Sequence, residues 1–141
     1  MHLFQLGGVR FADYPGFDAD TRDERISRAV IIDPGFGGSA DPASLNTALP
    51  GITLINLGDA DRLGAADVGP EGNNLANRLP DARYVEIAPA NHFTFLSTCK
   101  PGATGMLEEE GEDPICSDPA GTDRQATHAR LIDAVATGLG L

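Results

Sequence analysis

The chain has 141 residues, 41% of them hydrophobic, which suffices for one domain with a core of its own. Its formal net charge of −11 argues against nucleic acid or an anionic membrane surface as a partner. No apolar run approaches the roughly 20 residues that a membrane span needs, and the first residues lack the basic start of a signal peptide.

The first part of the chain predicts an irregular lead followed by one strand. Residues 1–25 contain Gly-Gly and Pro-Gly pairs and a charged stretch, so we expect irregular turns there, and the domain proper over residues 26–141. Residues 29–34 are rich in β-branched side chains and end at a proline, which predicts a strand. Asp41 is a predicted helix N-cap, because Pro42 would then occupy the first helical position.

The middle of the chain is organised around residues 52–57. This apolar run is followed by a glycine and predicts a strand buried on both faces, as in a parallel sheet. The pattern then predicts a helix over residues 70–79 and a third strand over residues 82–87. The apolar side of that helix would comprise Leu75, Ala76 and Leu79.

The last part of the chain predicts a loop and a docking helix. Residues 98–121 hold prolines, glycines and an acidic run, which favours a solvated excursion. Thr122 and Gln125 fit a capping box for the final helix, whose apolar stripe should pack on the sheet. The order of elements predicts an α/β fold with about three parallel strands and flanking helices. The residues of the stripe are Leu131, Ile132, Val135 and Leu139.

Polar side chains follow two neighbouring strands of the predicted sheet. Asp59 and Asp61 come after the second strand, and His92 follows the third. Taken singly, a solvated loop carboxylate and a packed histidine are the commoner interpretations. Together at one rim of a parallel sheet, where ligands bind, a carboxylate can fix the imidazole tautomer and leave the other nitrogen as a base.

These residues lie in segments that resemble a known family. The sequence resembles the C-terminal half of an α/β-hydrolase over about residues 23–141, closest to predicted dienelactone-hydrolase-like proteins. That group has an acid three residues after a glycine and a histidine before an aromatic. The segments that carry the resemblance are residues 23–34, 58–61, 90–95 and 116–124.

The resemblance implies a partial α/β-hydrolase fold that lacks its N-terminal half. Asp61 would be the acid of a Ser-His-Asp triad and His92 the base, with Asp59 as the second candidate for the acid. The implied substrate is a small-molecule ester or lactone, hydrolysed without a cofactor once an N-terminal half complements the chain.

The nucleophile of such an enzyme is missing from the sequence. Its elbow has the pattern G-x-S-x-G on a strand-to-helix turn, and no serine here matches it. Ser39, at the end of a glycine-rich stretch, comes nearest, but a flexible turn explains that stretch better. An Asp–His pair without a nucleophile and oxyanion donors should give little hydrolysis, so we expect the chain alone to be inactive.

The cysteines and acidic residues leave no metal site in view. Cys99 and Cys116 lack the spacing of a zinc site; either they form a disulfide, which would indicate an exported protein, or they are two separate thiols. The stretch from Asp59 begins like a calcium loop, but Leu63 and Pro70 occupy positions that need oxygen ligands.

Three functions therefore stay open. The first is an incomplete esterase or lactone hydrolase, and the second is a small binding or structural domain without catalysis. The third is a hydrolase whose nucleophile has moved to Ser39. Exposed strand edges predict self-association of the lone chain.

Overall fold

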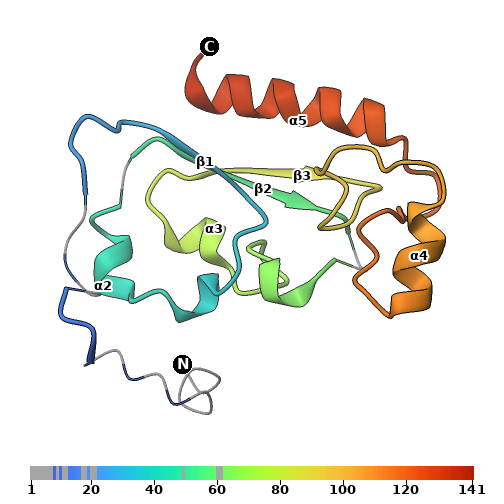
Figure 1. Cartoon of the computed structure of the whole chain (residues 1–141). Helices are drawn as coiled ribbons and strands as arrows, with labels where there is room; N and C mark the ends of the chain where they lie inside the picture. Colours follow the sequence, from blue (N-terminus) through green and yellow to red (C-terminus); the bar gives the residue numbers. More distant parts are fainter. Residues whose placement is uncertain are drawn as a thin grey trace.

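Three parallel strands form the centre of a mixed α/β structure (Figure 1). The computed structural model describes residues 8, 10, 13–16, 19, 22–48, 50–59 and 62–141. Strands β1 (Ala29–Ile32), β2 (Ile52–Leu57) and β3 (Arg83–Ile87) pair in the order β1-β2-β3. The three predicted strands and their parallel direction are confirmed.

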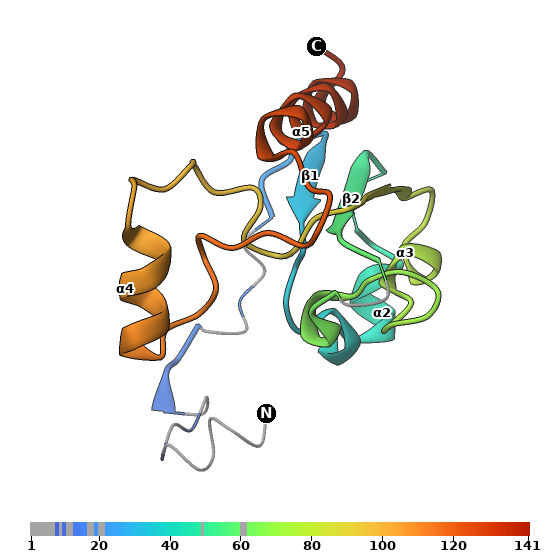
Figure 2. The same cartoon turned by 90° about the vertical axis from the view of Figure 1, so that its right-hand side faces the viewer.

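Helices cover both faces of this sheet. Helix α5 (Arg124–Leu139) lies across one face, and α2 (Pro42–Leu45) and α3 (Leu75–Arg78) lie on the other (Figures 1 and 2). Helix α4 (Ala103–Glu110) lies to one side and buries none of its residues. Two short 3₁₀ turns, η2 (Gly37–Ser39) and η3 (Gly64–Ala66), complete the described elements.

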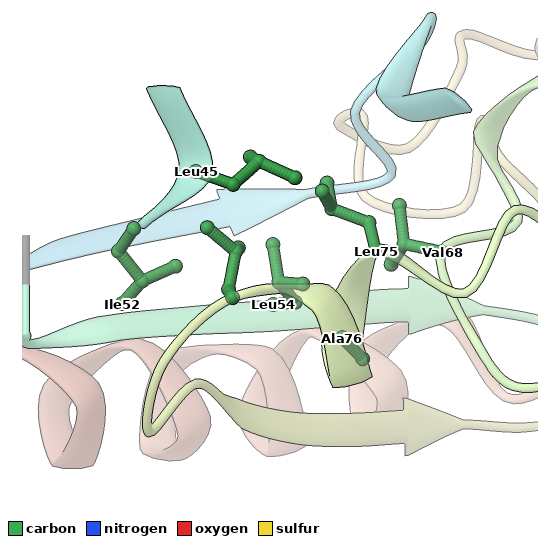
Figure 3. Packing of buried hydrophobic residues seen from close by; sticks show 7 residues of the cluster. Leu45, Ile52, Leu54, Val68, Leu75 and Ala76 are labelled. Atoms are coloured by element: carbon green, nitrogen blue, oxygen red, sulfur yellow. The ribbon is translucent and has the colours of Figure 1, made fainter. Parts of the chain in front are cut away.

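The central strand β2 is buried along its whole length, as its sequence predicted. Successive side chains point to opposite faces, so Leu54 packs toward α2 and α3 while Ile55 packs toward α5, and both are fully buried. Each such side chain contributes about 1.5–3 kcal/mol on burial. Figure 3 shows the first cluster, which consists of Leu45, Ile52, Leu54, Val68, Leu75, Ala76 and Leu79.

The helix predicted over residues 70–79 is much shorter in the structure. Asn74 has a left-handed backbone with φ of 58°, so the helix begins only at Leu75. The preceding residues form tight turns instead of a helix. Gly72 packs so closely against Asp67 in these turns that a Cβ at this position would clash. The predicted burial of the helix's apolar side is nevertheless confirmed.

The helix starts agree with the sequence only in part. The predicted cap at Asp41 is confirmed, since its carboxylate accepts a hydrogen bond of 2.9 Å from the Ser44 N–H. Helix α5 is capped by Asp123, which accepts from the Ala126 N–H, and the capping box at Thr122 is wrong by one residue.

Helix α5 docks on the sheet as expected, but through a different stripe. Leu131 is buried, whereas Ile132 is 67% exposed. Arg124, the first residue of the helix, is buried and forms an ion pair with Asp118 at 2.8 Å. The buried positions are accordingly Arg124, Thr127, Leu131 and Ala134.

The excursion over residues 98–121 is more ordered than predicted. It contains α4, and a disulfide joins Cys99 to Cys116 with 5.7 Å between their Cα atoms. The structure therefore has the first of the two alternatives for these cysteines. The crosslink closes the excursion into a loop beside the residues that follow β3 (Figure 2).

Candidate active site

Asp33 lies at the carboxyl end of β1, where the chain leaves the sheet. Its own N–H still pairs with the Ile55 carbonyl, and its φ of 44° then turns the chain away. The side chain is buried and points toward the ends of the neighbouring strands. Its Oδ1 accepts hydrogen bonds from the Leu57 N–H (2.8 Å) and the Asn56 amide (2.9 Å).

The second oxygen of Asp33 contacts a histidine from the far side of the sheet. His92 follows β3, and its Nδ1 lies 3.1 Å from Asp33 Oδ2. Because an ionised carboxylate can only accept hydrogen bonds, this contact requires the tautomer in which Nδ1 carries the proton. β2 lies between β1 and β3, so the side chains of Asp33 and His92 meet across the carboxyl end of the middle strand.

The turn over residues 91–96 fixes the position of this imidazole. Asn91 Oδ1 accepts from the Phe93 N–H at 2.9 Å, and the Thr94 N–H donates to the Asn91 carbonyl at 3.0 Å. The rings of Phe93 and Phe95 meet the imidazole edge-on. Gly58 allows this approach, because a Cβ there would lie 2.7 Å from the Ala90 carbonyl oxygen.

His92 opens onto a cavity of about 840 Å³. Its side chain is 29% exposed, and within the described part of the chain its Nε2 has no hydrogen-bond partner. The imidazole is therefore oriented by Asp33 at Nδ1 while the ring borders the cavity, which is the arrangement of a general base. The remaining lining is apolar except for two carboxylates and two smaller polar groups: Leu63, Asn91, Phe93, Asp113, Pro114, Ser117, Asp118 and Pro119.

Of the two acids predicted from the sequence, only Asp59 lies in the described part of the chain, and it does not make this contact. Asp61 lies outside that part, so its predicted role stays a prediction. Asp59 is exposed, and its backbone carbonyl accepts from the Arg62 side chain. Sequence reasoning assigned no role to Asp33, although a carboxylate directly after a strand and before a Pro-Gly turn signals the same sheet rim.

Arg62 organises a separate polar cluster beside the site. Burial disfavours its charge, but hydrogen bonds to Glu86 and Tyr84 outweigh that effect and raise its pKa. Burial raises the pKa of Tyr84 as well. Arg62 also approaches Asp67, at 3.4 Å. Its donors are thus engaged within the protein, so the cluster stabilises the loop after β2.

No described serine is placed to act with His92. Ser39 is exposed in η2, and Ser117 lines the cavity of His92, but neither hydroxyl is hydrogen-bonded to the imidazole. A nucleophile and its base must come within hydrogen-bond reach. Within the described residues, there is also no group of three or more His, Cys, Asp or Glu side chains that could hold a metal ion.

Comparison with known proteins adds no relative. No family model, no curated protein and no solved structure matches the chain. Among the helices of the described part, none is both long and apolar enough to traverse a lipid bilayer. We therefore infer the function of the chain from the geometry of Asp33 and His92.

Proposed function

We propose that this chain supplies the acid and base of a serine esterase or lactone hydrolase of the α/β-hydrolase type, with the nucleophile on a polypeptide segment outside it. The observation that carries the proposal is the 3.1 Å contact between Asp33 Oδ2 and His92 Nδ1 at the carboxyl rim of a parallel sheet. The missing elbow motif explains why the chain has a base without a group to activate.

In this mechanism His92 Nε2 removes the proton from the incoming serine hydroxyl. Asp33 holds the Nδ1–H tautomer and stabilises the imidazolium that forms, and His92 then returns the proton to the leaving alkoxide. Water follows the same path in the second half of the reaction. The mainly apolar cavity beside the ring accommodates an uncharged part of the ester or lactone.

The experiment is complementation with the segment encoded immediately upstream of this chain, read out with p-nitrophenyl butyrate. We expect hydrolysis by the mixture and not by either part, and a loss of about 10⁶-fold for His92→Ala. Asp133→Asn, an exposed change on α5, is the matched control for the loss of one carboxylate.

Two further variants identify the acid. If Asp33 is the acid, Asp33→Asn lowers turnover by about 10⁴-fold, because the amide favours the wrong imidazole tautomer. If Asp61 is the acid, as the sequence predicted, Asp61→Asn has that effect instead. Absence of hydrolysis in the mixture, or full activity of His92→Ala, would refute the proposal and favour a domain without catalysis.

A further inference from the structure

The turn that carries His92 is fastened to the segment closed by the disulfide. Thr94, which is fully buried, donates through its hydroxyl to Asp118 Oδ1 at 2.8 Å. The side-chain amide of Asn91 donates to the Ser117 carbonyl, also at 2.8 Å. Asn91, directly before His92, is therefore bonded to the first residue after Cys116. Thr94, two residues after His92, is bonded to the second.

Asp118 is itself held by the first residue of α5. Arg124 donates to both of its carboxylate oxygens, at 2.8 and 2.9 Å, and to the Ile115 carbonyl at 3.1 Å. The hydrogen bonds from Arg124, and to a lesser extent from Thr94, lower the pKa of Asp118 despite its partial burial. A bidentate pair of this kind fixes direction as well as distance. Thr94 is thus bonded to a rigid support.

On the other side, α5 holds the turn through His128. His128 Nε2 lies 2.8 Å from the Thr94 carbonyl oxygen and 3.1 Å from that of Leu96. These contacts act on the backbone after His92. The Asn91 and Thr94 side chains bond to each other's residue and to the Phe93 N–H within the turn, and their contacts outside it are those to residues 117–118. Cys116 joins that segment to Cys99, which follows the turn.

We propose that Asp118 is a positioning residue for His92, and that the Cys99–Cys116 disulfide keeps Asp118 in place. Loss of either loosens the turn and lets the imidazole leave Asp33. The importance of this for hydrolysis rests on the proposed function, but the coupling itself is a property of the chain alone. Reduction by a dithiol breaks the S–S bond, converts both cysteines to thiols and oxidises the reductant to its disulfide.

The test uses ¹⁵N NMR of the histidine side chains in the isolated chain at about pH 8.5, where imidazole is ordinarily neutral. In the parent protein we expect His92 to hold its proton on Nδ1, giving one protonated and one bare ring nitrogen. Asp118→Asn, Cys99→Ser with Cys116→Ser, and dithiothreitol treatment should each shift both resonances toward the average of exchanging tautomers. Asp133→Asn removes an exposed carboxylate on α5, away from this cavity, and should leave them unchanged.

A second pair of variants keeps the test independent of folding defects. Thr94→Val removes, at nearly constant volume, the hydroxyl that donates to Asp118 and accepts from the Asn91 N–H, and it should reproduce the shift; Thr94→Ser keeps both bonds and should retain the parent spectrum. A fixed Nδ1–H tautomer in the reduced chain and in every folded variant would overturn the inference. Because no nucleophile is needed, that outcome is distinct from failure of the complementation assay.

Discussion

Replacing Asp33 should destabilise the protein by an amount that its hydrogen bonds define. Asp33→Asn keeps the shape of the side chain and suits the φ of 44°, since asparagine tolerates left-handed backbone well. It converts two buried charge-assisted bonds, from Leu57 and Asn56, into neutral ones. Charge-assisted bonds are worth about 1.5–3 kcal/mol and neutral ones about 0.5–1.5 kcal/mol, so the free energy of unfolding should fall by about 2 kcal/mol.

Asp33→Ala should cost more, because it leaves two buried donors without an acceptor. Each such group costs about 1–3 kcal/mol, which gives about 2–6 kcal/mol in total. Strain from a non-glycine residue at positive φ adds about 1 kcal/mol for alanine. A loss of this size is a large part of the stability of an ordinary domain.

Urea unfolding at neutral pH measures both changes. With a slope of about 1–3 kcal/mol per molar urea, a loss of 2 kcal/mol lowers the midpoint by about 1 M. Asp41→Asn is the matched control, because asparagine caps a helix as well as aspartate does and the midpoint should hardly move. An Asp33→Asn midpoint equal to that of Asp41→Asn, or an alanine variant no weaker than the asparagine one, would refute the reasoning.

Three other outcomes are expected. Leu54→Ala should lose about 2–5 kcal/mol of unfolding free energy by urea titration, because Leu54 is fully buried in the core. Ile132→Ser should leave stability within about 0.5 kcal/mol and reduce self-association in sedimentation velocity, because Ile132 is 67% exposed beside other apolar residues of α5. The pKa of Asp118 is lower in the folded protein than in the unfolded chain. Its contribution to stability is therefore present at pH values above the unfolded-state pKa and is lost as the pH falls through the folded-state pKa. Acid titration by circular dichroism should therefore show a shallower loss below about pH 4 for Asp118→Asn than for the parent.

The sheet could be predicted from the sequence because its strands are encoded locally. Residues 52–57 are apolar on both faces, and only a covered parallel strand accommodates that pattern. The short α3 could not be predicted, since the turn before it depends on contacts that no local pattern encodes: the Asn73 N–H donates to the Asp67 carbonyl and the Asn74 N–H to the Gly69 carbonyl. The orientation of α5 was missed for the same reason: its partner Asp118 lies in a segment without a recognisable pattern.

The sequence predicted a histidine and a carboxylate at one edge of the sheet but did not single out Asp33, and the role of Asp61 stays a prediction. His92 stands at the end of β3, as expected, beside a carboxylate that follows the other outer strand. The sequence favoured Asp61, and Asp59 after it, because both follow the glycine that ends β2. That Asp33 makes the contact follows from side-chain direction at the end of β1, which periodicity does not encode.

The contact between Asp33 and His92 spans the full width of the sheet, because Asp33 follows β1 and His92 follows β3. The N–H of Leu57, in the middle strand, donates a hydrogen bond to Asp33. Fraying of either outer strand would then separate the pair while the middle strand stays paired with its remaining neighbour. The Asp33–His92 contact therefore reports whether both outer strands are paired, and it should be lost under milder conditions than those that unfold the core.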